Sequence, residues 1–306
     1  MPGVFSDALA WAVILTLGVG ALAANRHRRI ARTAIIAGWV GFAIFWLQLV
    51  PHFAFIHKSY IEGILSVAAV PASLYTGWLY YQGRDRLVVL SRAVAAMGLL
   101  YLPFETIPTI AMFGLSVPAP RGMLMETVAA QTRMLVNMVG YDPAMIVGDQ
   151  GYLNTFEFYD GDHRLTVSVV LACTGLGSIS IFGGLIAAVE APFYRKLRAL
   201  AVVVPIIYAL NLLRTTFITI AFGKQYMHWF VEEILLLFGS SDPYMVSFFI
   251  SDRIISQFLA VIVLIGLTYL AVRELPELLV IIEDVLYLLT GDEYDLERAL
   301  GLNRGM

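Results

Sequence analysis

Long apolar stretches separated by short polar loops dominate the sequence as far as about residue 272. Seven of these stretches are long enough to cross a ~30 Å hydrocarbon core at 1.5 Å per helical residue. Five contain no charged residue or histidine, and the other two contain one charge each. They lack the two-residue alternation of membrane barrel strands. We therefore predict an all-α, polytopic transmembrane bundle of about seven helices, at residues 8–24, 33–51, 63–83, 93–120, 165–189, 199–223 and 254–272.

The basic residues predict the orientation of these helices. Arginine-rich loops follow the first, third and fifth helices, at residues 26–32, 84–86 and 195–198. The loop after the second helix contains only Lys58, and the segment after the sixth contains only Lys224 before the next arginine. Because cytoplasmic loops carry the excess of Lys and Arg, we expect the N-terminus outside, the C-terminus in the cytoplasm, and a multi-pass protein of the cell membrane.

Two long segments lie on the predicted outer side, at residues 121–164 and 224–252. The first precedes the candidate active-site helices of residues 165–272, and the second lies between the last two of these helices. In the first segment, residues 122–139 have a helical pattern. In the second, residues 226–238 are apolar but contain two adjacent glutamates, which favours an interfacial helix over an eighth span.

The composition agrees with a membrane protein. Hydrophobic residues make up 59% of the 306 residues, charged residues make up 14%, and the mean hydropathy is +0.78, which excludes a water-soluble globular enzyme. The net charge of −3 is too small to suggest a nucleic-acid partner. Since no internal repeat is present, we expect one membrane domain, residues 1–306, with a cytoplasmic tail at 273–306 that contains a solvated surface helix at 276–289.

Arg214 is the first candidate site residue, because a charge inside the hydrocarbon layer is costly and usually functional. It lies nine residues before the outer end of its predicted helix, ~13 Å below the membrane boundary. Asn211 and Thr215 lie three residues before it and one residue after it, so they share or border its helix face. A purely structural arginine would instead extend to the outer headgroups.

Cys173 is the one cysteine of the chain, which excludes an internal disulfide and a multi-cysteine metal site. In the predicted fifth helix it would lie ~12 Å below the outer boundary, at a depth similar to that of Arg214. It would share a helix face with Gly177, Ser180 and Gly184, and such a stripe of small residues permits close helix packing. Taken alone, a membrane cysteine is more often a packing residue.

Three further residues could take part in a site. Arg253 opens the seventh predicted helix, with Gln257 four residues later on the same face, and it is either a site residue or an interfacial anchor. Glu105 is either an ion-pair partner for an arginine or a group that stabilises a kink. His228 is the one plausible histidine base for a cysteine nucleophile. No HExxH, GxSxG, P-loop or CxxC pattern is present, so we expect no metal and no cofactor.

A thiol between two guanidinium groups has a defined chemistry. The positive charges stabilise the thiolate, more strongly in a low-dielectric site than in water. A thiolate can attack a peptide carbonyl to form an acyl-thioester, and the guanidinium groups can hold the developing oxyanion. Because arginine is effectively always protonated, it is a poor general acid or base, and electrostatic stabilisation is its natural role.

Three sequence features resemble the exosortase/archaeosortase family: Ala-Cys-Thr-Gly at 172–175, Asn-Leu-Leu-Arg-Thr at 211–215, and the arginine at the start of the next helix, Arg253. Their order, spacing and topology agree with the family over residues 165–260. Bacterial members carry a histidine where this chain has Arg253, and the archaeal branch shows the same departure as this chain. The resemblance implies a membrane-embedded cysteine transpeptidase with its active site toward the extracellular face.

The resemblance also implies the partners of such an enzyme. They are exported surface proteins, such as S-layer glycoprotein, whose C-terminal sorting signal consists of a Pro-Gly-Phe motif, a transmembrane helix and a basic tail. The enzyme would cleave near the motif and attach the new C-terminus to a membrane lipid. By the family's usual assignment, Cys173 forms the acyl-thioester, Arg214 donates a proton and Arg253 stabilises the transition state. The supporting positions are Thr174, Asn211, Thr215 and Gln257.

Two other functions fit the same residues. A small transporter would use Arg214 and Glu105 as binding or relay charges, and it would tolerate Cys173→Ala. A cysteine-dependent membrane acyltransferase would carry an acyl lipid on Cys173 in place of a peptide. Identification of the group attached to the thiol separates these functions.

Overall fold

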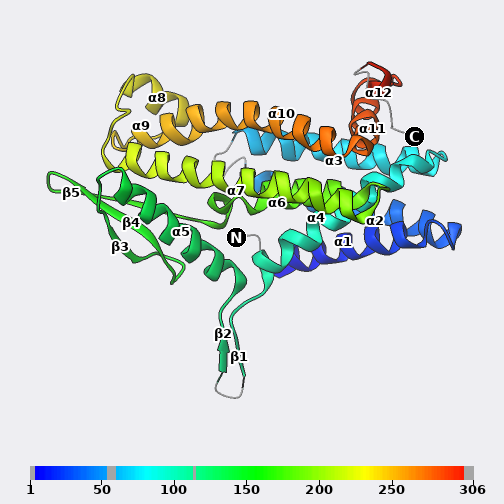
Figure 1. Cartoon of the computed structure of the whole chain (residues 1–306), viewed down its shortest axis with the longest axis horizontal. Coiled ribbons are helices and arrows are strands. Elements are labelled where there is room, and N and C mark those ends of the chain that lie inside the picture. The colour runs from blue at the N-terminus through cyan, green and yellow to red at the C-terminus, as the bar shows by residue number, and fades with distance from the viewer. Residues whose placement is uncertain (1–3, 54–59, 113–114, 300–306) are drawn as a thin grey trace. The chain divides into compact units, whose positions relative to one another are not determined.

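The computed structural model describes residues 4–53, 60–112 and 115–299. Within these ranges the chain is mainly helical, with two small antiparallel sheets (Figure 1). Lys58, which contributes to the predicted orientation, lies outside the described residues. The chain divides into two compact units, a first unit of Met1–Thr106, Ser180–Val202 and Leu270–Met306, and a second unit of Ile107–Ile179 and Val203–Tyr269.

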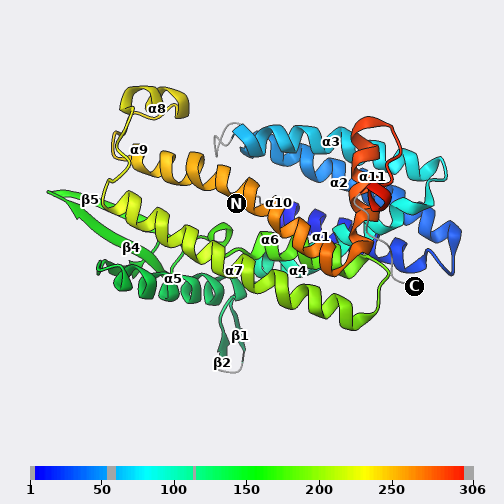
Figure 2. The ribbon, with the colours of Figure 1, turned by 45° about the horizontal axis from the view of Figure 1, so that its top comes forward.

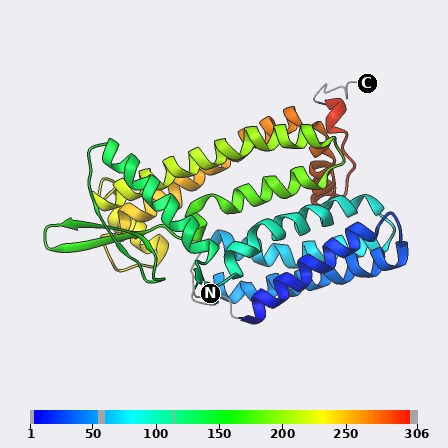
Figure 3. The same ribbon diagram turned by 60° about the horizontal axis from the view of Figure 1, so that its bottom comes forward.

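Four helices form much of the first unit, and they lie at the first four predicted stretches: α1 (Val4–Ala23), α2 (Arg28–Pro51), α3 (Tyr60–Tyr81) and α4 (Val88–Thr106). Figures 1 and 3 show them running side by side. A Cβ on Gly38 would lie 2.5 Å from the Leu17 side chain, so the glycine allows α1 and α2 to approach closely. The Trp39 indole nitrogen donates a hydrogen bond of 3.0 Å to the Ser91 hydroxyl in the same core.

The fourth predicted helix, residues 93–120, is wrong beyond Thr106. Pro108 disfavours helical geometry at the residue before it and cannot donate a backbone hydrogen bond. After this proline, strands β1 (Ile110–Met112) and β2 (Leu115–Val117) form an antiparallel hairpin.

The tail forms helix α11 (Leu279–Thr290) after a 3-10 turn at Pro276–Leu278, but its inner face is packed, where a solvated helix was expected. The Asp284 side chain is 1% exposed and lies 4.0 Å from an Arg84 nitrogen. The Arg84 guanidinium lies 3.3 Å from the centre of the Tyr287 ring. Burial raises the pKa of Asp284, and the nearby Arg86 and Arg84 charges oppose this effect only in part. Helix α11 is therefore a packed element of the first unit.

In the second unit, helix α5 (Pro120–Met138) lies along a three-stranded antiparallel sheet (Figures 1 and 2). Its strands, in spatial order, are β3 (Ala144–Val147), β4 (Leu153–Asp160) and β5 (His163–Ser168). Val128 and Ala129 of α5 are buried with Phe156 of β4. Helix α5 confirms the helical pattern at residues 122–139. The described chain is mainly helical, as predicted, but the two small sheets correct the expectation that it is entirely α-helical.

Strand β5 also corrects the fifth predicted helix, residues 165–189. Leu165, Val167 and Val169 are buried, and the residues between them are exposed. This alternation, with several β-branched residues, is that of a half-buried strand. A 3-10 turn at Leu171–Thr174 follows, and helix α6 (Leu176–Ala188) begins only after it.

The remaining helices are α7 (Phe193–Gly223), α8 (Val231–Phe238), α9 (Met245–Phe248), α10 (Gln257–Glu274) and α12 (Leu296–Ala299). Helix α8 is only part of the helix expected at residues 226–238, and its eight residues, ~12 Å long, are too short for an eighth span. Across the described ranges, five helices are long and apolar enough to cross a membrane: Phe5–Ala23, Arg28–Pro51, Asp85–Thr106, Phe193–Gly223 and Met245–Glu274.

Candidate active site

Cys173 lies on the 3-10 turn Leu171–Thr174, between strand β5 and helix α6. Its backbone N–H donates a hydrogen bond of 2.8 Å to the Val170 carbonyl. The expected helix face shared with three small residues is therefore wrong, because Cys173 precedes the first residue of α6. The half-buried thiol therefore lies on the turn that joins β5 to α6, outside the helix.

The residues after Cys173 explain the local shape of the turn. The buried Thr174 hydroxyl donates a hydrogen bond of 2.7 Å to the Leu171 carbonyl and accepts one of 3.4 Å from the Leu176 N–H. Gly175 has φ +78°, a left-handed conformation that favours glycine. A Cβ on Gly175 would lie 3.2 Å from the Asn211 side chain, so the glycine also allows close approach to α7.

Two side chains of α7 bind the backbone of Cys173. The Asn211 amide nitrogen donates a hydrogen bond of 2.5 Å to the Cys173 carbonyl oxygen, and the Thr215 hydroxyl donates one of 3.2 Å to the same oxygen. They lie four residues apart, and therefore on one face of the helix. Asn211 and Thr215 thus fix the cysteine turn to the helix that also carries Arg214.

Arg214 lies between these two positions of α7 and forms an ion pair that the sequence did not predict. Its Nη2 donates a hydrogen bond of 2.6 Å to Oδ1 of Asp252. The other Asp252 oxygen lies 3.5 Å from Nε of Arg253. One carboxylate, 16% exposed, therefore contacts both candidate guanidinium groups. The sequence feature that could have identified Asp252 is an acid next to an arginine in an otherwise apolar segment.

Arg253 lies inside a long helical run, so the prediction that it opens a helix at residue 254 is wrong. The run extends over Met245–Glu274 and contains a π-helical segment at Phe249–Ser256. The Ser256 hydroxyl donates a hydrogen bond of 2.7 Å to the Ser251 carbonyl five residues earlier, which agrees with the wider π turn. Such segments are rare and frequently occur at functional sites.

Gln257 begins α10 directly after this π segment and is half-buried. Its side chain forms no hydrogen bond with any residue in the part of the chain that the structure describes. Of the four supporting positions, three therefore take part in the hydrogen bonds around Cys173, and Gln257 does not.

Three charged groups act on the Cys173 sulfur. Arg214 and Arg253 contribute positive charges and Asp252 a negative one, and the backbone of Val170 forms a hydrogen bond with the thiol. The structure therefore brings the three residues selected from the sequence into one site, and it adds a carboxylate to them. Burial raises the pKa of the Cys173 thiol, and the Val170 hydrogen bond and the two arginine charges oppose this effect only in part. The three formal charges sum to plus one, which favours an oxyanion that develops beside the sulfur.

The other residues considered from the sequence lie elsewhere. His228 is exposed and is not among the groups whose charges act on Cys173. Glu105 belongs to α4 of the first unit, and the carboxylate paired with Arg214 is Asp252. Within residues 4–53, 60–112 and 115–299, no three His, Cys, Asp or Glu side chains cluster so that they could hold a metal ion.

A family model described as "Transmembrane exosortase (Exosortase_EpsH)" matches residues 5–248. This chain belongs to the exosortase family. The matched residues include the Cys173 turn and the Asn211–Thr215 part of α7, and they end just before Asp252. Family membership and the apolar helices together support a multi-pass membrane exosortase.

Two curated relatives of this exosortase are both named archaeosortase A. The relative from Haloferax volcanii is 70% identical over 303 residues, which cover 99% of this chain and 100% of the relative. The relative from Natronomonas pharaonis is 43% identical over 290 residues, which cover 92% of this chain and 88% of the relative. No solved structure matches the chain. The resemblance to the archaeal branch of the family is thereby confirmed.

Proposed function

We propose that this exosortase is a cysteine transpeptidase of the cell membrane that cleaves the C-terminal sorting signal of exported surface proteins. It then passes the new C-terminus to a membrane lipid through an acyl-thioester on Cys173. The observation that carries the proposal is the attachment of the Cys173 turn to α7, beside Arg214, in a chain whose relatives are named archaeosortase A. The active site would face the outside of the cell, and S-layer glycoprotein is the expected type of substrate.

In the first step, the Cys173 sulfur attacks the carbonyl carbon of the scissile peptide bond. The S–C bond forms, the C–N bond breaks, and the thiol proton leaves with the released amine. Arg214 and Arg253 stabilise the thiolate and then the oxyanion, because a guanidinium stays protonated throughout. Asp252 is the acid whose charge acts on the thiol, so we assign to it the transfer of the proton from sulfur to amine.

In the second step, a nucleophilic group of a membrane lipid attacks the acyl-thioester. A new bond forms between the lipid and the carbonyl carbon, the C–S bond breaks, and the sulfur leaves as a thiolate. The lipid's proton returns through Asp252 to the sulfur. The Asn211 and Thr215 hydrogen bonds keep the cysteine backbone in one place during both steps, which favours repeated attack from the same geometry.

The test is a reaction of the full-length protein in lipid bilayers with a peptide that carries a C-terminal sorting signal and a transmembrane helix. Mass spectrometry then follows the cleaved tail, the peptide bound to Cys173 and the lipid-linked product. We expect all three with the natural chain and none with Cys173→Ser. Complete processing by Cys173→Ser would overturn the proposal, and an acyl lipid on the thiol in place of a peptide would identify an acyltransferase.

A further inference from the structure

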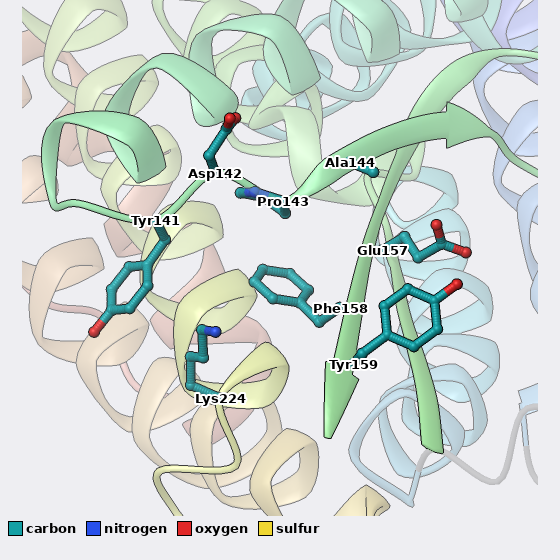
Figure 4. A pocket seen from close by; sticks show the side chains of 8 residues that line it. All are labelled: Tyr141, Asp142, Pro143, Ala144, Glu157, Phe158, Tyr159 and Lys224. Carbon is teal, nitrogen blue, oxygen red and sulfur yellow. The ribbon is translucent and has the colours of Figure 1, made fainter. Parts of the chain in front are cut away.

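A cavity of about 240 Å³ lies in the second unit at the end of helix α7 (Figure 4), and no residue of the cysteine turn lines it. Its walls come from the loop after α5, from strands β3 and β4, and from the first residue after α7. The lining residues are Tyr141, Asp142, Pro143, Ala144, Glu157, Phe158, Tyr159 and Lys224.

Gly223, the last residue of α7, determines how Lys224 meets the sheet. A Cβ on Gly223 would lie 2.5 Å from the Phe158 ring, so only glycine allows this ring to pack against the helix end. The Lys224 Nζ consequently lies 5.9 Å from the centre of the Phe158 ring and 5.5 Å from that of Tyr141. Figure 4 shows the ammonium group between the two rings. The lysine is exposed, so a ligand in solution or in the membrane surface can reach its charge.

The two acids of the cavity wall are already paired with arginines. Asp142 lies 3.4 Å from Arg133, and Glu157 forms an ion pair with Arg164. Figure 4 shows both carboxylates pointing away from the Lys224 ammonium. Of the acids that the structure describes, none forms an ion pair with Lys224. The cavity therefore has one cation whose charge is not balanced by an acid, next to aromatic walls.

A tyrosine pair adds a hydrogen-bond donor at the rim. The Tyr141 and Tyr226 hydroxyl oxygens lie 2.6 Å apart, so one proton bridges them and the other can be donated outward. The hydrogen bond to Tyr226 raises the pKa of Tyr141, which keeps this hydroxyl protonated well above neutral pH. A lysine and a phenol together suit an oxyanion.

The position of Lys224 along the chain indicates which anion is available. It directly follows Phe193–Gly223, a helix long and apolar enough to cross a membrane. A lysine and tyrosines at the end of such a helix lie at the level of the lipid headgroups, where phosphate is the abundant anion. The aromatic walls would contact the less polar atoms that follow the phosphate in a lipid.

We propose that this cavity binds the phosphate group of a membrane lipid, with the Lys224 ammonium on the phosphate oxygens and the Tyr141, Phe158 and Tyr159 rings around the glycerol end. The site stands apart from the proposed reaction, because ten residues, ~15 Å of helix, separate Lys224 from Arg214. Inorganic phosphate offers the same oxyanion without the apolar atoms, so it must bind more weakly.

The three lysines of the chain allow a direct test. In the full-length protein, reductive ¹³C-dimethylation gives one NMR signal for each lysine and keeps its charge. The protein is titrated with dihexanoyl phosphatidylglycerol, with inorganic phosphate, and with dihexanoylglycerol, which lacks the phosphate. We expect the Lys224 signal to shift to saturation with the phospholipid, at a concentration at least about tenfold below that of phosphate. Lys196, whose Nζ donates to the Ala187 carbonyl, is the internal control and should not shift.

Two variants separate the outcomes. Ala144→Phe fills the cavity but leaves Lys224 in place, and it should weaken phospholipid binding at least about tenfold. Cys173→Ser should bind as the natural chain does, so a failure of the proposed reaction leaves this result unaffected. The proposal is overturned if Lys224 does not shift, if Lys196 shifts equally, if inorganic phosphate binds as tightly as the lipid, or if Ala144→Phe binds normally.

Discussion

Asp252 in the second unit and Asp284 in the first unit are both largely buried acids beside arginines, yet their surroundings differ. Asp252 accepts a hydrogen bond of 2.6 Å from Arg214 and lies 3.5 Å from Nε of Arg253. Asp284 is more deeply buried, with 1% of its side chain exposed against 16%, and the Arg84 nitrogen is 4.0 Å away. Both Asp284 oxygens are buried without a hydrogen bond.

The two acids differ in whether charged donors bind the buried carboxylate directly. A buried carboxylate is stabilised when charged donors bind it directly, and it destabilises the fold when they do not. Asp252 connects two helical segments through its arginines and keeps both guanidinium groups near Cys173. Asp284 is retained by the packing of α11. Burial alone therefore does not identify a functional carboxylate, whereas the geometry of its partners does.

The largest expected effect comes from Asp252→Asn. Asparagine cannot hold two guanidinium groups by charge or carry a proton from sulfur to amine, so we expect cleavage of a sorting-signal peptide to slow by at least ~100-fold. The matched variant Asp284→Asn should stay within about twofold of the natural rate. Equal losses in the two variants would remove the distinction between the two acids.

A smaller loss is expected for Arg214→Lys. An ammonium keeps the charge but cannot reproduce the planar array of donors, so we expect cleavage to slow by roughly 10- to 100-fold. Arg84→Lys, which changes the arginine beside Asp284, is the control and should cleave at the natural rate. A fully active Arg214→Lys would show that the shape of the guanidinium does not matter in this site.

Two left-handed glycines test the geometry of the cysteine turn. Gly175 has φ +78° and Gly291 has φ +81°, so alanine at either position should destabilise the fold by ~1–2 kcal/mol. Only at Gly175 would the new Cβ meet a neighbour, at 3.2 Å from Asn211. Cleavage should therefore fall about tenfold in Gly175→Ala and remain near normal in Gly291→Ala. Thermal unfolding and cleavage rates of both variants, measured together, separate stability from positioning.

The smallest effect is expected from the pH dependence of Asp284→Asn. Because burial raises the pKa of Asp284, the ionised side chain destabilises the fold at neutral pH and protonation relieves this cost as the pH falls. Asp284→Asn should therefore unfold at a higher temperature than the natural chain at pH 7. The gain should shrink as the pH is lowered through the range in which Asp284 takes up a proton. A destabilised variant at pH 7 would show that the ion pair with Arg84 outweighs the burial.

The helices α1 to α4 could be predicted from the apolar pattern because a membrane-length helix needs little more than an uninterrupted apolar stretch. The second unit departs from that rule. The end of strand β5 belongs to the charge-free stretch that begins at Leu165, and only the alternating burial of Leu165, Val167 and the following Val169 distinguishes it from a helix. The 3-10 turn and the π-helical segment depend on contacts that are distant in the sequence.

For the site, chemistry was more informative than periodicity. Cys173, Arg214 and Arg253 could be selected because each is unusual in an apolar segment. Asp252 was not selected from the sequence. Its main partner is Arg214, 38 residues earlier in the chain, and only the folded helices show that pairing.

The most direct test of the site is the reactivity of Cys173, which is the one cysteine and therefore the one residue that a thiol reagent labels. Alkylation by iodoacetamide at pH 7 reports the thiolate fraction in the natural chain, Arg214→Gln, Arg253→Gln and the control Arg84→Gln. We expect the two site variants to react at least about threefold more slowly and the control to react at the natural rate. Equal alkylation rates in all four proteins would contradict the claim that the two guanidinium groups act on this thiol.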